Sequence, residues 1–380
     1  MPGATAIVVG AGAFGAAIAD RLARSDWEVT LVDQFEPGDP RASSGGESRL
    51  LRFSHGGDHW HASSAWRSRD LWRELDPELF VEAGVVWLAQ RAGGWEDDSQ
   101  AVLRELGIPV ERLSVDQAAE LLPGVAGSDL EFAVFEPAAG LLRAQDAVRA
   151  LVDRARAHGA RLVPGRAVPD GEGVLLDDGR HLAADRVIRA SGAWLAALFP
   201  GLERLRVTLQ ELVFFEPPTR AWRMPPTPGW VDYDGAFYGT GDLDGHGVKV
   251  APDVEGPEFD PRAGARDPSG DAVTRAREYA SRRFPALANA PVIAAKTCQY
   301  ELTADTRFIA APHPEHASVW LLGGGSGHGF KHGPAMAERM AGALRGEEPM
   351  PERFRLGPRA AADSMRTAGS NPHPRSEPGT

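Results

Sequence analysis

The hydrophobic pattern is most regular at the start of the chain. An apolar run at residues 7–9 leads into a Gly-x-Gly-x-x-Gly turn, and apolar residues then recur at helical spacing up to residue 23. A second apolar run, at 28–32, ends on Asp33. Strand, glycine turn, helix and a second strand ending on an acid form the pattern of a dinucleotide-binding turn. We therefore predict a pyrophosphate at the helix N-terminus and a ribose hydroxyl at Asp33.

Each glycine of this turn has a separate expected role. Gly10 allows the tight turn, Gly12 lets the backbone approach the pyrophosphate, and Gly15 lets the helix pack closely on the strand. Glycines at this spacing also occur in ordinary turns. The order of strand, helix and acid is therefore what favours a nucleotide site.

Apolar spacing predicts the other elements along the chain. Helices are expected at 61–75, from the capping box at Ser114 to about 122, over a segment that ends at Gly159, and at 334–344. Strands are expected at 84–89, 161–163, 174–182 (a hairpin), 186–190 and 319–322. Residues 206–304 alternate short apolar runs with turns rich in proline and glycine, which predicts mostly β-structure.

Three predicted strands end on glycine turns, near 10–15, 191–193 and 323–329. A chain of 380 residues also exceeds the roughly 250–300 at which one core usually divides. We therefore predict an α/β protein in which a β-rich substrate domain is threaded through a discontinuous, Rossmann-like nucleotide domain. The expected divisions are 1–75, 140–205 and 305–356 for the nucleotide domain, 76–139 and 206–304 for the substrate domain, and 357–380 for a disordered tail.

The composition narrows the partners and the compartment. A formal net charge of −12 argues against nucleic acid and anionic membranes as partners. The single cysteine, Cys298, excludes an intrachain disulfide and fits a reducing cytoplasm. No signal-peptide pattern precedes the first strand, and no apolar run reaches the length of about 18 residues that a membrane span needs. We expect a cytoplasmic protein.

Six motifs occur together in a fixed order: the first glycine turn with its acid, Gly-Glu-Ser-Arg-Leu-Leu-Arg at 46–52, Phe-Tyr-Gly at 237–239, Val-Lys at 248–249, Thr-Cys-Gln-Tyr at 297–300, and Gly-His-Gly-Phe-Lys at 327–331. With them, the chain resembles the FAD-dependent amine oxidoreductases of the D-amino-acid-oxidase and glycine-oxidase class, and within it monomeric sarcosine oxidase and N-methyltryptophan oxidase. The likeness extends to about residue 350. It implies FAD as the cofactor.

The resemblance assigns a role to each side chain that could carry chemistry. Cys298 matches a cysteine joined by a thioether to the flavin, so covalent FAD is implied. Arg52 and Lys331 match a pair that clamps a substrate carboxylate, which suits a planar cationic fork beside a point charge. Lys249 matches the lysine that activates O2, where a cation stabilises the negative charge that develops. Further implied residues are Arg49 beside the flavin ring, and Tyr238 and Tyr300 around the substrate.

The implied cofactor-binding set follows the same motifs. Its members are Gly10, Gly12, Ala13, Phe14, Gly15, Asp33, Ser44, Arg49, Gly192, Trp194, Cys298, Gly325, Gly327, Gly329 and Lys331. Taken singly, several of these residues have ordinary alternatives. Cys298 could be a small buried hydrophobe, Lys249 could face solvent from an alternating strand, and the arginines could be surface cations.

The chain departs from the sarcosine-oxidase pattern at two positions. Gly45 and Asp253 stand where these relatives have histidines on the substrate side of the flavin. An acid beside the substrate nitrogen would favour its ammonium form, whereas hydride transfer needs the neutral amine. Asp253 is therefore expected to meet a hydroxyl or a cationic group of a substrate larger than sarcosine.

The expected activity is that of an oxidase acting on a secondary amino acid, whether N-methyl, N-alkyl or cyclic. Hydride would pass to flavin N5 to give an imine, and O2 would reoxidise the flavin with release of hydrogen peroxide. The alternatives are an oxidase of fructosyl amino acids, a dehydrogenase that does not use O2, and a flavin-binding protein without catalysis. The expected partners are the small amino acid and O2, and the resemblance favours a monomer.

Overall fold

The computed structural model describes residues 3–201 and 205–359 of the chain. Its first large sheet has six strands, five of them parallel and one antiparallel at an edge. From edge to edge these strands are β19 (Ile309–Pro312), β20 (Val319–Gly323), β13 (Arg186–Arg189), β1 (Thr5–Val9), β2 (Glu28–Asp33) and β9 (Arg161–Pro164). The predicted strand–helix–strand at the chain start lies at the centre of this sheet.

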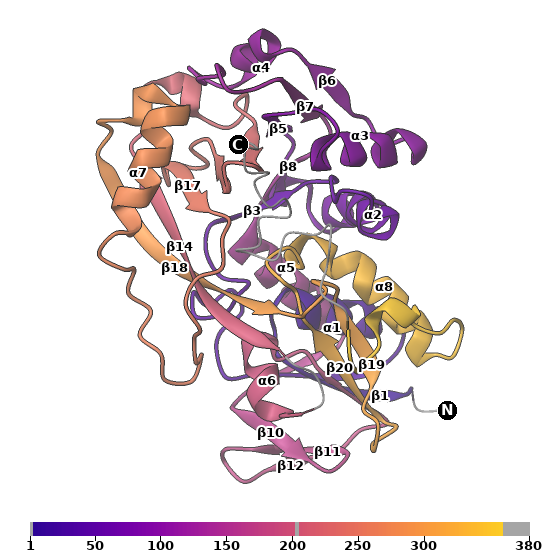
Figure 1. The fold of residues 1–380 in the computed structure, drawn as a ribbon. Helices are drawn as coiled ribbons and strands as arrows, with labels where there is room; N and C mark the ends of the chain where they lie inside the picture. Colours follow the sequence, from indigo (N-terminus) through magenta and orange to yellow (C-terminus); the bar gives the residue numbers. More distant parts are fainter. Residues whose placement is uncertain (1–2, 202–204, 360–380) are drawn as a thin grey trace, which may run out of the picture.

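Helices cover one face of this sheet and a small meander covers the other (Figure 1). Helix α1 (Ala13–Ala23) packs between α5 (Ala144–Ala157) and α8 (Gly333–Leu344), and nine of its eleven residues are buried. Because α1 is small and apolar nearly all round, it can fill the space between two helices and a sheet. The meander consists of β10 (Ala167–Asp170), β11 (Gly173–Leu176) and β12 (His181–Leu182).

The second large sheet has eight strands and joins two distant parts of the sequence. Strand β5 pairs in parallel with β15, which brings the segment around residue 87 beside the segment around residue 230. In order across the sheet, the strands are β18 (Val292–Leu302), β14 (Arg206–Phe215), β17 (Val248–Pro252), β16 (Phe237–Thr240), β15 (Gly229–Asp232), β5 (Val85–Ala89), β7 (Phe132–Glu136) and β6 (Glu111–Leu113).

A third, three-stranded sheet lies between the two large ones in the view of Figure 1. It is formed by β3 (Ser48–Leu51), β8 (Gly140–Arg143) and β4 (Phe80–Val81). The remaining α-helices are α2 (His59–Leu75), α3 (Trp95–Glu105), α4 (Val115–Leu121), α6 (Leu195–Leu198) and α7 (Ala272–Arg283). The short 3-10 turns are η1 (Pro77–Leu79), η2 (Gly192–Trp194), η3 (Arg220–Trp222), η4 (Pro285–Leu287), η5 (Phe330–His332) and η6 (Glu352–Phe354).

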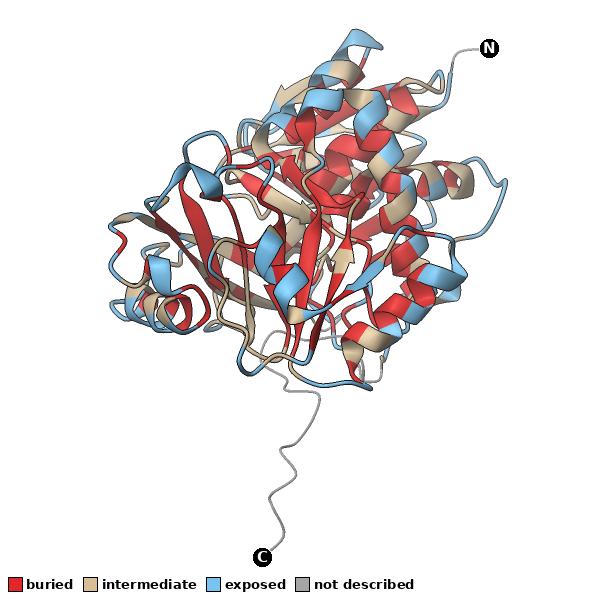
Figure 2. Cartoon of the chain, turned by 90° about the horizontal axis from the view of Figure 1, so that it is seen from above, coloured by how far each residue is buried: buried red, intermediate tan, exposed pale blue. Residues whose placement is uncertain are grey.

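The interior is continuous across the layers. Figure 2 shows buried residues along the strands of both sheets and on the inner sides of the helices, with exposed residues on the outer turns. The largest apolar cluster extends from α1 and the six-stranded sheet to α2, α3 and part of the eight-stranded sheet. No helix in the described ranges has the length and apolar character that a membrane crossing requires.

The predicted helices and strands form close to their expected bounds, and the α/β class is confirmed. The predicted capping box is present: Ser114 Oγ accepts from Gln117 N, and Gln117 Oε1 accepts from Ser114 N. Helix α7 was missed, since its buried face is made of alanines, Tyr279 and a charged residue, Arg283. Of the predicted tail, 360–380 lies outside the described residues, and the division into two domains stays a prediction.

Candidate active site

The first glycine turn brings β1, β13 and α1 into close contact. Gly10 has φ +106°, and a Cβ there would lie 2.2 Å from Ala190 O. A Cβ on Gly15 would lie 1.7 Å from Gly10 O, so a side chain would push α1 away from the strand. The predicted roles of Gly10 in turning the chain and of Gly15 in packing agree with this geometry.

The N-terminus of α1 points its backbone N–H groups into a cavity. Gly12 offers no side-chain cap, and the N–H of Ala13 donates to Ser44 Oγ at 2.8 Å. The Asp33 carboxylate accepts from Ala11 N at 2.5 Å and from Phe35 N at 2.8 Å, which fixes it at the end of β2. Burial raises the pKa of Asp33 above its usual value. Such a terminus attracts anions.

Three adjoining cavities run from this turn across the molecule. The first is lined by Gly10, Gly12, Asp33, Ser44, Gly192 and Trp194. The second shares Gly12, Ser44 and Gly192 with it and continues along Ala13, Phe14, Arg49, Cys298, Gly325, Gly327 and Gly329. The third shares Arg49, Cys298 and Gly327 with the second and ends among Arg52, Tyr238, Lys249, Asp253, Tyr300 and Lys331. Every predicted site residue except Gly15 therefore lines this series.

Arg49 and Cys298 lie at the junction of the second and third cavities. Arg49 sits on β3 and donates to the carbonyl oxygens of Ser43 at 2.8 Å, Gly45 at 2.5 Å and Ser48 at 2.7 Å. These bonds hold its Nη2 3.7 Å from the sulfur of Cys298 on β18. The sulfur, on a partly buried residue, therefore faces a fixed cation.

Two cations of the third cavity lie close together, Lys331 buried and Arg52 partly buried. Lys331 is 2% exposed, and its Nζ donates to His328 O at 3.1 Å. Burial, and then the charge of Arg52, lowers the Lys331 pKa well below its ordinary value. Burial also lowers the pKa of Arg52, whose guanidinium lies 5.1 Å from the ring centroid of Trp87. Two desolvated cations side by side favour an anionic ligand between them.

A buried acid that the sequence analysis did not identify positions the loop carrying Arg52. Glu136, 0% exposed at the end of β7, accepts from the backbone N–H groups of Phe53 at 2.6 Å and Ser54 at 3.0 Å, and from Trp87 Nε1 at 2.7 Å. Its charge also favours the protonated forms of Arg52 and Lys331. No motif marks Glu136, because its partners are backbone groups distant in sequence.

Lys249 enters the third cavity from β17. Its Nζ donates to Ser48 O and to Ser48 Oγ, each at 3.2 Å, and the residue is 3% exposed. Burial, followed by the charge of Arg49, lowers its pKa to about 7. The alternative of a solvated lysine on an alternating strand is thereby excluded.

Two tyrosines and one acid share the same cavity. The hydroxyls of Tyr238 and Tyr300 are hydrogen-bonded to each other, and burial raises the pKa of Tyr238 to about 12 and that of Tyr300 well above 10. Both hydroxyls therefore stay protonated at neutral pH. Asp253 lines this cavity too, and its negative charge acts on Arg52 and on both tyrosines.

Sequence reasoning did not identify a cluster of three aromatic residues that lines this cavity. Trp95 from α3 stacks on Tyr233 with ring centroids 4.7 Å apart and an interplanar angle of 13°, and it also contacts Trp87 at 4.6 Å. All three line the cavity, as do His55 and His328. Trp87 and Trp95 stand in a segment without any of the six motifs, whereas His328 lies inside the last one and could have been found there.

The glycine at 45 is a structural requirement of this chain. A Cβ at Gly45 would lie 2.4 Å from Asp39 O and 2.7 Å from Pro40 Cα, both backbone atoms. The turn at residues 39–45 therefore folds too tightly to accept a histidine.

Comparison with known proteins agrees with this architecture. A family model described as "DAO: FAD dependent oxidoreductase" matches residues 5–343. The chain belongs to this family of FAD-dependent oxidoreductases. The three cavities in series, the N–H groups of α1 and the glycines without room for a Cβ fit an extended dinucleotide, with its adenosine end at Asp33 and its flavin end near Cys298.

Individual relatives confirm the expected resemblance. The chain is 29% identical to monomeric sarcosine oxidase of Bacillus sp. (strain B-0618), over 87% of this chain and 90% of that protein. It is 26% identical to N-methyl-L-tryptophan oxidase of Yersinia pestis (strain Pestoides F), over 91% and 95%. Among solved structures, a modified fructosyl peptide oxidase from Aspergillus nidulans superposes with a TM-score of 0.83 at 18% identity, covering 98% of this chain and 97% of that one. That structure shows the shared fold.

Proposed function

We propose that this FAD-dependent oxidoreductase oxidises a secondary amino acid and uses O2 as the electron acceptor. The observation that carries the proposal is the arrangement of buried cations in the third cavity. Arg52 and Lys331 both line this cavity, close enough for the charge of Arg52 to lower the pKa of Lys331, and Lys249 reaches the same cavity from β17. Lys331 is held by a hydrogen bond to His328 O, whereas Lys249 is held by Ser48. Two cationic sites held by different neighbours suit two tasks, the binding of a carboxylate and the reduction of O2.

In this proposal the carboxylate of the substrate binds to Arg52 and Lys331. Burial has removed water from around both cations and lowered their pKa values. A bound carboxylate would supply an ionic partner in place of that water. A planar guanidinium can donate to both carboxylate oxygens, and Glu136 holds the loop that presents it. The fixed carboxylate orients the neighbouring carbon and the amine nitrogen of the substrate.

The substrate amine binds in its neutral form. Tyr238 and Tyr300 remain protonated hydroxyls, so they can orient a nitrogen or an oxygen without adding charge. FAD, when bound, takes up a hydride from the substrate carbon and delivers the electron pair to O2. The amine thereby becomes an imine, which water hydrolyses, and O2 with two protons becomes hydrogen peroxide.

Lys249 is proposed to act in the oxygen step. Its ammonium is buried beside Ser48 and close enough to Arg49 to be affected by that charge. Negative charge that develops on O2 would be stabilised by this cation in a site of low dielectric constant. Cys298 is proposed to bind the cofactor covalently, because its sulfur lies at the flavin end of the cavities beside Arg49.

The direct test is a panel of N-methyl, N-alkyl and cyclic amino acids added to the purified holoenzyme. We expect anaerobic bleaching of the flavin by at least one of them and stoichiometric hydrogen peroxide in air. Bleaching without peroxide, with turnover only when an artificial acceptor is present, would identify a dehydrogenase. Absence of bleaching with the whole panel would contradict the proposed substrate class.

A second candidate substrate is a fructosyl amino acid or another hydroxylated secondary amine. Asp253 motivates it, since this carboxylate lies in the same cavity as the clamp and can accept hydrogen bonds from hydroxyls. The fructosyl peptide oxidase noted above shares the fold. An Asp253→Asn variant should then raise KM for hydroxylated substrates and leave KM for simple N-methyl amino acids unchanged. Equal effects on both would exclude this role.

We further propose that the protein is a cytoplasmic monomer. A single cysteine and a net charge of −12 suit a reducing, aqueous compartment. Light scattering of the purified holoenzyme tests the oligomeric state, and a mass near twice the 40.7 kDa of the chain would contradict it.

A further inference from the structure

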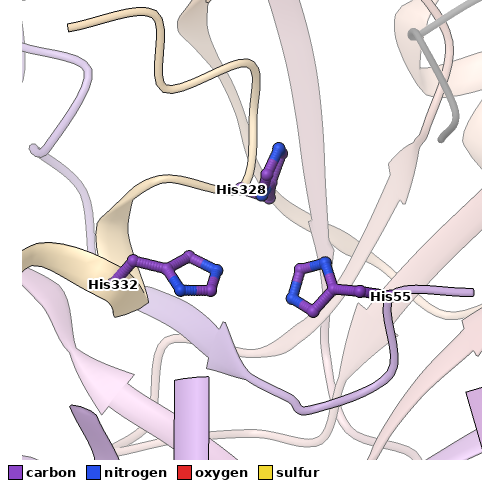
Figure 3. A group of neighbouring side chains, drawn as sticks. All are labelled: His55, His328 and His332. Atoms are coloured by element: carbon purple, nitrogen blue, oxygen red, sulfur yellow. The ribbon is translucent and has the colours of Figure 1, made fainter. Parts of the chain in front are cut away.

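Close to Lys331, the structure gathers four histidines from three segments of the chain. His55 follows β3, His61 belongs to α2, His328 precedes η5, and His332 is the last residue of η5. The ring centroids of the four lie 5.0 to 5.9 Å from one another. His55, His61 and His332 are at most 2% exposed. In Figure 3, the rings of His55, His328 and His332 surround one common space.

Hydrogen bonds fix the orientation of three of these rings. His328 Nε2 lies 2.9 Å from Thr306 O, and a carbonyl can only accept, so Nε2 carries the proton. His61 Nδ1 lies 3.0 Å from an oxygen of Asp58, and His332 Nδ1 lies 3.0 Å from Ser64 Oγ. An oxygen partner on one ring nitrogen is the usual support for a metal-binding histidine, because it leaves the other nitrogen free to coordinate.

One nitrogen of each of the four rings is buried without a hydrogen-bond partner in the described part of the chain. They are His55 Nε2, His61 Nε2, His328 Nδ1 and His332 Nε2. In a neutral imidazole one nitrogen carries the proton and the other has a free lone pair, so each of these nitrogens can coordinate a metal when the proton is on the other nitrogen. Buried polar atoms are nearly always satisfied in folded proteins. Several unpaired ring nitrogens beside one space, with no donor among the described residues, indicate that this space can bind a group that accepts electron pairs, such as a metal cation.

We propose that His55, His328 and His332 bind one transition-metal dication of the Zn²⁺ or Co²⁺ class, with a fourth position open to the cavity. One nitrogen from each residue lies within 4.8 Å of the others. Zn–N bonds of about 2.0–2.1 Å require an inward shift of about 1 Å or less for each ring. Imidazole ligands without carboxylates favour Zn²⁺, Co²⁺, Ni²⁺ or Cu²⁺ over Mg²⁺ and Ca²⁺.

The surrounding charges set the strength of this site. Lys331 and Arg52 oppose a dication, as their effects on the histidines show. Asp58, hydrogen-bonded to His61, supplies a nearby negative charge. His55 and His328 line the third cavity, which gives an ion its route to the site. We therefore expect an exchangeable ion that chelators remove, in contrast to a permanent structural zinc.

The test is a Co²⁺ titration of chelator-treated holoenzyme, followed by the visible bands of tetrahedral Co²⁺ to the red of the flavin absorption. We expect one equivalent per chain in the wild type and at least tenfold weaker binding in His332→Gln. Of the three ligands, His55 and His328 line the third cavity and His332 does not. The His332→Gln substitution therefore removes a metal ligand without changing the lining of that cavity. This readout does not depend on catalytic activity.

A competing explanation is the pair His313 and His316, whose ring centroids lie 4.9 Å apart on a partly exposed loop. The double variant His313→Gln/His316→Gln removes that pair and should retain the tetrahedral bands. Loss of the bands in the double variant, or no Co²⁺ binding by the wild type, would overturn the proposal. If His332→Gln does not fold, the double variant decides: Zn²⁺ should raise its Tm, and an unchanged Tm overturns the site.

Discussion

The guanidinium of Arg49 lies 3.7 Å from the sulfur of Cys298, although 249 positions separate the two residues. Three backbone carbonyls hold the arginine in this place, so its position is a property of the loop at 43–48. A fixed cation beside the sulfur stabilises negative charge on it before the sulfur bonds to a carbon atom. The pair therefore lies where the second cavity joins the third.

The covalent link predicts a simple difference between wild type and Cys298→Ser. Acid-precipitated wild-type protein should stay yellow, while the variant should give a white pellet and release its flavin to the supernatant. The serine keeps the shape of the side chain but lacks the nucleophilic thiolate. Arg49→Met should also reduce the coloured fraction, since the sulfur loses its cationic neighbour. A yellow pellet from Cys298→Ser would place the attachment elsewhere.

The carboxylate clamp predicts a loss of substrate binding in Lys331→Met. A charged hydrogen bond contributes about 1.5–3 kcal/mol, so kcat/KM for an amino acid should fall roughly 10- to 150-fold, mainly through KM. The matched comparison is the corresponding amino-acid amide, which has no carboxylate. Its kcat/KM should change little between wild type and variant. Equal losses for acid and amide would show that Lys331 supports the fold instead.

Because Gly45 has no room for a side chain, we expect that the histidine of the sarcosine-oxidase pattern cannot be introduced at this position. Gly45→His places a Cβ against backbone atoms of Asp39 and Pro40, so the turn must move and Arg49 loses a carbonyl partner. We expect a lower Tm, a smaller covalently bound fraction and no gain with sarcosine. Gly57→Ala is the control, because a Cβ there has no heavy atom within 4 Å. A stable Gly45→His enzyme with higher sarcosine activity would refute the steric explanation.

The sequence allowed the cofactor half of the site to be predicted because its signals are local. Glycine turns, apolar periodicity and the acid at Asp33 follow one another along a few dozen residues, and each dictates its own backbone. The side chains at the flavin end could be named only through the resemblance. Their spacing alone left Cys298 and Lys249 with ordinary structural explanations.

The features that were missed depend on contacts between distant segments. Glu136 acts on the loop of Arg52 through backbone N–H groups, which leave no pattern in the sequence. Trp95 reaches the cavity only because β5 joins the sheet formed by later strands. Helix α7 escaped prediction because its inner face carries Arg283, a residue that is normally exposed.

That buried arginine predicts a large effect on stability. Arg283 is 2% exposed and pairs with Asp232 at 2.9 Å and with Asp129 at 2.7 Å, while Tyr279 also donates to Asp232. Arg283→Met leaves Asp232 charged and buried, which costs about 3–5 kcal/mol. Chemical denaturation of the holoenzyme measures this loss. Arg180→Met, which removes an exposed pair with Asp178, should leave the unfolding midpoint unchanged.

Lys249 predicts a pH dependence confined to the oxygen step. Its pKa of about 7 means that the ammonium predominates below pH 7 and is lost as the pH rises through that value. The rate constant for reoxidation by O2 should therefore be highest at acidic pH and decline above about pH 7. Lys249→Met should lower it roughly 10²- to 10³-fold, the usual effect of removing one group that stabilises developing charge.

Stopped-flow measurements can separate this step from substrate oxidation. Anaerobic bleaching by substrate should be nearly the same in Lys249→Met as in wild type, since the clamp formed by Arg52 and Lys331 is intact. Mixing the reduced variant with O2 should then give slow reoxidation without the inflection near pH 7. If the variant keeps both the fast reoxidation and its pH dependence, another cation of the cavity performs this role. Arg49, whose positive charge acts on Lys249, is the residue to test in that case.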